Sequence, residues 1–505
     1  MAAASFSADP VDVARNQSEG GAREHNRQDA NTDVSNLPGN VESLIHLDGT
    51  ARQIEPQIRG HPEHWSNRTF VFIMVFCCLL GMGGFCKQPV GVSVCTLVIS
   101  FTLSSNHVNT ELRLPENDHQ LSTMWLLGSS IGFLLVGRLS DLYGRRWFIF
   151  CASFLGAIGS ILGWFGSSIG VHFAANICNG IAAAAQISFA FVVGELVPAE
   201  VRALYFPATL LAPCVAAFVL PAVTPTASLD NTTAWRRNYC LGTICAFFSA
   251  WVYLWCYFPP SYRQLNVAGG SMLQMVKSVD IIGIFFFIFG CVLTLFGLSC
   301  IGPAYQWGRY EVVGMLLGGG TSFLVFIIHE VFFCKTSALL PPKLFRNRHY
   351  VALVNNAAFA SMTYSVVYVF WPTIVGKVFD ENPDAISNAI AWQEAILGGS
   401  LWYGMALAGT FLSLFHLAKS ICLISASVAM IVLGCLGGMQ LDELIQITVL
   451  IALLCVAIGF IENVAITGVT YVWDAQDIGL AFGVLGCLCS LGCAFAQVGF
   501  ASILD

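Results

Sequence analysis

Long apolar runs follow one another along almost the whole chain after residue 65, and they restrict the possible fold more than any other feature. A helix that crosses a membrane needs about 20 mostly apolar residues, because the hydrocarbon core is about 30 Å thick. Of the 505 residues, 56% are hydrophobic and only 10% are charged. A soluble domain carries about 25% charged residues. The sequence therefore excludes a soluble enzyme and predicts an all-α integral membrane protein.

The apolar runs predict about 13 transmembrane helices. They lie near residues 69–104, 120–139, 147–165, 171–194, 205–224, 238–258, 279–300, 312–333, 350–372, 391–415, 420–438, 444–466 and 478–503. The first is treated as one overlong span that Pro89 interrupts, since proline breaks helices. Lys and Arg are enriched in alternate short loops, which predicts an N-terminus on the inside and residue 505 on the outside.

Other sequence features limit the partners of the chain. Residues 1–65 are polar and predict a disordered cytoplasmic tail without the apolar stretch of a signal peptide. Asn231-Thr232-Thr233 falls in a loop expected outside, so Asn231 is a glycosylation candidate. There is no Cys/His cluster with zinc spacing, no phosphate-binding loop and no basic patch. We therefore expect no metal, no cofactor, no ATP-driven pump and no nucleic-acid partner.

A group of glycines and charged residues stands between the second and third predicted spans. Its members are Gly137, Asp141, Gly144, Arg145 and Arg146. The glycines permit a tight turn and close helix approach. Asp141 can pair with the arginines or with a helix N-terminus, which attracts anions. We predict that this group forms a conformational gate; the alternative is that the arginines only anchor the topology.

This pattern resembles the loop signature of the major facilitator superfamily. Further motifs resemble the fungal 14-span branch that holds trichothecene-type toxin efflux pumps and siderophore-iron transporters. They include Trp235-Arg236, Asp280-Ile281-Ile282-Gly283, Leu340-Pro341-Pro342 and Gln476-Asp477-Ile478-Gly479. The resemblance covers roughly residues 110–504 and ends at the thirteenth span, so we expect the last span of the branch to be lacking.

The resemblance implies the major facilitator two-bundle fold. The expected parts are a tail at 1–65, an N-terminal six-span bundle at 66–260, a linker with two extra spans at 261–345, and a truncated C-terminal bundle at 346–505. It also implies a monomer, in the plasma membrane or alternatively a vacuolar or vesicle membrane, with lipids, a small-molecule substrate and protons as partners.

For function, the resemblance implies a secondary transporter rather than an enzyme, working by alternating access. We expect proton-coupled export of a toxin, drug or secondary metabolite, with siderophore-iron import as the alternative. Asn176 stands where many proton-coupled relatives carry an arginine. This departure and the missing span support an alternative of another class, a degenerate, non-transporting or sensor-like membrane protein.

Ionisable side chains inside membrane spans are costly, so they are candidate functional residues. Glu462 is the deepest acid of the C-terminal half, and burial favours the neutral form of a carboxyl that can carry a proton. The alternative is a neutral Glu462 that only bonds a neighbouring helix. Gln186, Asn355, Asn356 and Tyr364 complete the expected proton or substrate cavity. The two asparagines are adjacent and point about 100° apart on a helix, so both cannot face one cavity squarely.

Overall fold

A computed structural model describes residues 119–143, 145–187, 280–299, 310–333, 339–378, 383–415, 417–439, 444–473 and 477–504, with scattered positions between 210 and 251. All of these residues belong to one unit, Pro62–Asp505. The predicted tail, the predicted span at 69–104 and Asn231 lie outside the described residues, and the predicted spans at 205–224 and 238–258 are described only in part.

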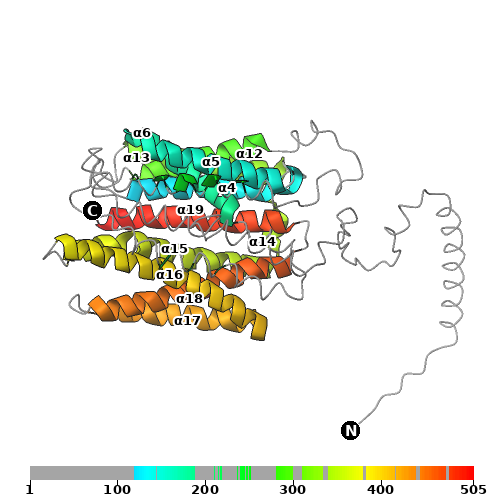
Figure 1. Ribbon diagram of the computed structural model, residues 1–505. Helices are drawn as coiled ribbons and strands as arrows, with labels where there is room; N and C mark the ends of the chain where they lie inside the picture. The colour runs from blue at the N-terminus through cyan, green and yellow to red at the C-terminus, as the bar shows by residue number, and fades with distance from the viewer. Residues whose placement is uncertain are drawn as a thin grey trace, which may run out of the picture. The chain divides into compact units, whose positions relative to one another are not determined.

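Every regular element in the described ranges is an α-helix (Figure 1). The helices are α4 (His119–Tyr143), α5 (Arg145–Phe165), α6 (Ile169–Ile187), α12 (Ile281–Ser299), α13 (Tyr310–Phe332), α14 (Pro342–Arg346), α15 (Arg348–Val378), α16 (Pro383–Phe415), α17 (Ala418–Leu436), α18 (Leu444–Val472) and α19 (Ile478–Leu504). By length and composition, nine helices of the described part can cross a membrane, and α6 is a shorter apolar helix. The chain is therefore an all-α multi-pass membrane protein.

The centre of the described fold is the packing of α4 against α19. These two helices share the most extensive contact between any two of the described helices, although they stand more than 300 residues apart in the chain. Ser129 lies opposite Ser490, and Ser130 opposite Cys487. Because the numbers rise along α4 while they fall along α19, the helices are antiparallel. Figure 1 shows α19 between α4 on one side and α15 on the other.

Two sets of helices flank this α4–α19 seam. On one side α6 packs against both α4 and α5, while on the other α18 packs against α15, α16 and α17. Glycines permit the closest approaches, since small residues let helix backbones meet. A Cβ atom on Gly180 of α6 would collide with the carbonyl oxygen of Trp125, and one on Gly459 of α18 with that of Leu401.

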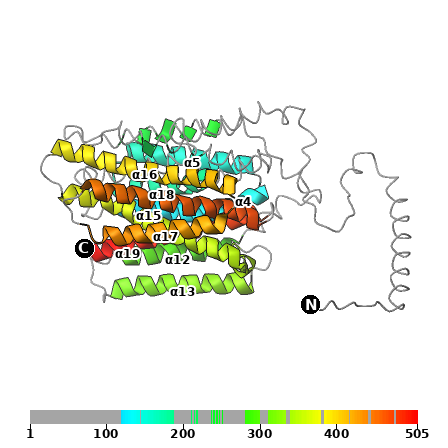
Figure 2. The same cartoon turned by 90° about the horizontal axis from the view of Figure 1, so that it is seen from below.

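The helices α12 and α13 form a hairpin outside this central seam. They pack along each other, and α12 makes a smaller contact with α19 and a slight one with α4. Figure 2 shows α12 and α13 side by side next to α19. At the start of α12, Asp280 Oδ1 accepts the backbone N–H of Gly283 at 2.9 Å. Asp280 Oδ2 lies 3.2 Å from His329 Nδ1 near the end of α13. The predicted spans at 279–300 and 312–333 thus pair as a hairpin that touches the seam through α12.

Candidate functional site

A cavity of about 210 Å³ lies between α4 and the helices α15, α16, α18 and α19. From α4, lining residues run from Ser122 to Phe133, and from α19 they run from Phe482 to Gln497. The cavity thus follows the seam, and helices of both flanking sets form its wall. A site in this position changes shape when the two sets of helices move relative to each other.

Glu462 on α18 lines the cavity and is held by a neighbouring helix. Its Oε1 accepts a hydrogen bond from Ser361 Oγ of α15 at 2.7 Å. A hydroxyl can donate to this oxygen whether the carboxyl is charged or neutral. Among the described residues that line the cavity, Glu462 is the only Asp, Glu, Lys, Arg or His. The described wall therefore offers one carboxyl group and no basic side chain to a solute.

Aromatic and hydroxyl side chains make up half of the remaining lining residues. The aromatic members are Trp125, Phe133, Tyr364, Tyr368, Trp402 and Phe482, and the hydroxyl members include Ser122, Ser129, Ser365 and Ser490. Tyr364 and Tyr368 stand with their ring centroids 5.4 Å apart. Ligand pockets of this kind are mostly apolar, with a few polar groups that fix orientation. The composition suits a largely apolar solute with a few hydrogen-bonding groups.

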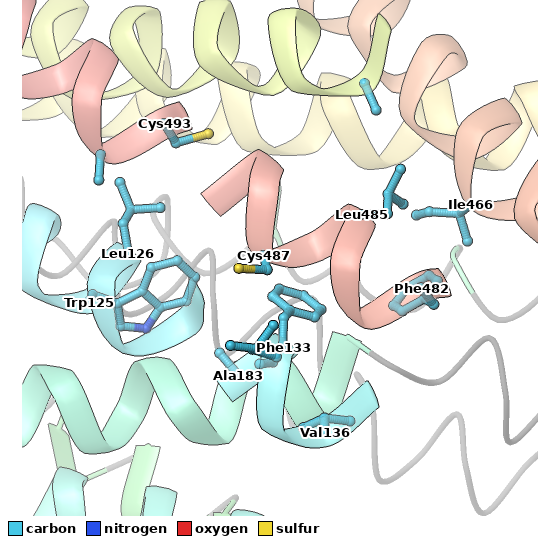
Figure 3. Close-up of a cluster of buried hydrophobic side chains, with 14 of the residues drawn as sticks. Trp125, Leu126, Phe133, Val136, Ala183, Ile466, Phe482, Leu485, Cys487 and Cys493 are labelled. Carbon is cyan, nitrogen blue, oxygen red and sulfur yellow. The ribbon is translucent and has the colours of Figure 1, made fainter. Parts of the chain in front are cut away.

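At the cavity end formed by Phe133 and Phe482, α4 and α19 pack tightly against each other. This contact includes Gly137, the first residue of the predicted gate. Phe133 and Phe482 meet with ring centroids 6.2 Å apart. One turn further along α4, a Cβ atom on Gly137 would lie 2.8 Å from the Gly479 carbonyl oxygen and 2.9 Å from the Gly483 Cα atom. We call the contact of Gly137 with these two glycines the glycine closure. Figure 3 shows Phe133, Val136, Phe482 and Cys487 in the buried cluster beside it.

The structure brings together only some of the residues that sequence reasoning selected. Glu462 and Tyr364 line the cavity, and Gly137 lies in the glycine closure. Only the backbone is described for Asp141, Arg145, Arg146 and Gln186, while Gly144 lies outside the described residues.

The structure corrects the expectation for the two asparagines of α15. Neither one lines this cavity, toward which α15 turns Ala357, Ser361, Tyr364, Ser365 and Tyr368. These five positions follow one stripe of the helix at spacings of three and four residues. Asn355 precedes that stripe by two residues and is exposed, while Asn356 is half-buried.

Several lining residues were missed by sequence reasoning. Trp125, Trp402 and Met405 look like ordinary apolar residues of a membrane span, and only the packing of α4 and α16 turns them into a wall. Gln497 on α19 carried a usable signal, because polar side chains within spans turn toward helix partners. Its exposed fraction is 2%, and it lies at the cavity end opposite the glycine closure.

Comparison with solved structures identifies the fold of this helix arrangement. The proton:xylose symporter XylE, a major facilitator protein, superimposes with a TM-score of 0.59 at 18% identity, covering 87% of this chain and 90% of that one. The chain therefore has the major facilitator fold.

The chain belongs to the fungal trichothecene efflux pump (TRI12) family, whose profile matches residues 85–504. This is a family of transport proteins and not a class of enzymes. The chain is 27% identical over 377 residues to trichothecene efflux pump TRI12 of Fusarium sporotrichioides, covering 73% of this chain and 62% of that protein. The corresponding pump of Trichoderma arundinaceum is 24% identical over 416 residues, covering 78% of this chain and 67% of that protein. The chain thus spans about two thirds of the length of these relatives.

Proposed function

We propose that the protein is a secondary transporter that exports an amphipathic toxin, drug or secondary metabolite by alternating access. The observation that carries this proposal is the cavity between α4 and the helices α15, α16, α18 and α19, with Glu462 on its wall. In alternating access, two bundles rock around a site between them. The direction of transport is inferred from the names of the two relatives, which are efflux pumps.

Proton coupling is assigned to Glu462. An ionised carboxylate inside a membrane is costly unless it is paired or faces water. Glu462 faces the cavity and has a hydroxyl partner, Ser361, that tolerates both protonation states. A cycle in which the carboxyl takes up a proton on one side and loses it on the other couples the proton gradient to movement of the solute.

We propose that the glycine closure is the conformational gate. With Gly137 against Gly479 and Gly483, this end of the seam leaves no room for even one methyl group. Asp141 and the two arginines that follow it, Arg145 and Arg146, are proposed to stabilise the closed form by charge. We propose the same bundle boundaries as the sequence predicts, with 66–260 and 346–505 moving against each other and 261–345 linking them. We also propose that the cell surface is the working membrane of a monomer.

The experiment compares cells with and without the protein, challenged with a trichothecene and, separately, supplied with a ferric siderophore as the iron source. Export predicts higher resistance to the toxin and a lower toxin content in the cells, with no change in growth on chelated iron. Better growth on chelated iron alone would favour an importer. Neither effect, with the protein inserted in the membrane, would contradict transport and favour the non-transporting class.

A further inference from the structure

A group of side chains holds the start of α19 on the side away from α4. Lys343 of α14 pairs with Asp477, the residue before α19, with Nζ and Oδ2 2.7 Å apart. The same ammonium lies 5.9 Å from the ring centroid of Trp473, at the end of α18. Tyr350 of α15 donates its hydroxyl hydrogen to the Ala481 carbonyl oxygen at 2.7 Å. We call these five residues the α14 clasp.

The clasp and the glycine closure act on the same two turns of α19. Ala481, which Tyr350 binds, lies between Gly479 and Gly483 in the chain. Asp477 also caps these turns, because its carbonyl oxygen accepts the backbone N–H of Ala481 at 2.9 Å. Any shift of α19 away from Gly137 must therefore either break clasp contacts or carry α14, α15 and the end of α18 along.

The clasp is also tied to the linker hairpin. Glu330, near the end of α13, has an exposed fraction of 3%. Its Oε1 accepts the backbone N–H of Leu339 at 2.8 Å and that of Leu340 at 3.3 Å. These two residues lead into α14, where the buried Leu344 anchors the helix and Lys343 reaches Asp477. A continuous set of contacts thus runs from α13 to the glycine closure.

We propose that Lys343 and Tyr350 are positioning residues for the glycine closure. Through Asp477 and Ala481 they fix the first turns of α19 and so set the ratio of closed to open forms at the Gly137 end. The inference rests on the proposed function in that opening of this end is a step of alternating access. The two contacts differ in strength, because Tyr350 is fully buried while Lys343 is exposed to 58%. The ion pair of Lys343 with Asp477 is therefore the contact that can break when the Gly137 end opens.

The test measures how fast Cys487 is alkylated by a maleimide in the purified full chain, read by mass spectrometry of its peptide. Cys487 is buried in the seam, one turn beyond Gly483, so the opened end admits the reagent faster. The variants are Lys343→Met, which keeps the apolar stem over Trp473, Asp477→Asn and Tyr350→Phe. Arg346→Met is the matched control, because Arg346 is a second exposed cation of α14 outside the clasp.

Lys343→Met and Asp477→Asn are expected to speed alkylation of Cys487 about two- to fivefold, since an exposed ion pair contributes little more than that. Tyr350→Phe is expected to speed it as well. Arg346→Met should match the unchanged protein, and the exchanged pair of Lys343→Asp with Asp477→Lys should return the rate toward it. Equal rates in all variants would overturn the proposal, as would an exchanged pair that alkylates as fast as the single variants.

This test needs no substrate, so it separates two failures. Faster alkylation in a protein that moves no solute would overturn the proposed function and leave the clasp standing. Unchanged alkylation in a protein that transports normally would overturn the clasp alone. Lys343 is a surface residue, and a contact that breaks during transport cannot be essential for folding. Loss of the Lys343→Met protein during purification would therefore also contradict the proposal.

Discussion

The two ends of the α4–α19 seam are built from different residues for different tasks. At the Gly137 end, three glycines bring the backbones together and exclude even a methyl group. Toward the other end, serines, aromatic rings and Gln497 line a cavity beside the two helices. Both ends belong to the same two helices. This contrast leads us to propose that side-chain size along one seam determines where the protein closes and where it holds a solute.

The largest expected effect comes from filling the cavity end. Ala357 of α15 is small, buried and part of the cavity wall. In Ala357→Trp the indole occupies the space of the solute, so binding of a trichothecene to the purified protein should weaken by at least about 100-fold. Binding is measured by the change in tryptophan fluorescence or by calorimetry.

The matched control is Ala352→Trp, since Ala352 lies on the same helix but is exposed. It should bind as the unchanged protein does. If Ala357→Trp binds normally as well, the solute sits elsewhere and the contrast between the two ends is wrong.

A smaller effect is expected from adding bulk at the closed end. In Gly137→Val, the Cβ atom would lie under 3.0 Å from both Gly479 and Gly483. Overpacking of this kind costs about 1–3 kcal/mol, which lowers the ratio of closed to open forms between about fivefold and a hundredfold. Alkylation of Cys487 should accelerate accordingly, while the cavity itself is unchanged.

Gly434→Val serves as the control for helix propensity, because a Cβ atom at Gly434 of α17 meets nothing within 4 Å. Its alkylation rate should equal that of the unchanged protein. A Gly137→Val protein with the same slow rate would show that the glycine contact does not determine closure.

The smallest effect is expected at the partner of Glu462. Ser361→Ala removes the hydroxyl that lies 2.7 Å from Glu462 Oε1. A hydrogen bond contributes about 0.5–1.5 kcal/mol net, so proton-driven transport should slow by about two- to tenfold. Thr363→Val on the same helix is the control, because the Thr363 hydroxyl bonds its own helix at Phe359. Equal rates for both variants would mean that Ser361 does not position the carboxyl.

Much of the helical layout could be predicted from the sequence, because membrane spans leave a strong apolar signal. The predicted span at 279–300 agrees with α12 within two residues at each end. Agreement fails where helices continue beyond the apolar run. The span predicted at 391–415 begins at Pro383 instead, since its first two turns mix polar residues with Ile386 and Ile390 and form no continuous apolar run. Glu394 consequently lies well inside a helix and is fully buried.

The candidate site was only partly predictable. An acid within an apolar run stands out in any sequence, so Glu462 could be selected, and the spacing of the glycine motif selected Gly137. The wall opposite Glu462 could not be predicted from the sequence, because it depends on the pairing of α4 with α19, which stand more than 300 residues apart. The rotation of α15 about its axis also keeps Asn355 and Asn356 off the cavity wall. Two adjacent asparagines in a sequence do not indicate that rotation.

The proposed role of Glu462 in proton coupling is tested by a paired transport measurement on Glu462→Gln in sealed vesicles. Glutamine mimics the protonated acid, so the variant should still exchange a trichothecene down its gradient at close to the normal rate. It should no longer accumulate the toxin when a proton gradient is imposed. Glu394→Gln, at a buried acid outside the cavity wall, is the control and should accumulate normally. A Glu462→Gln protein that still concentrates the toxin against its gradient would contradict the account.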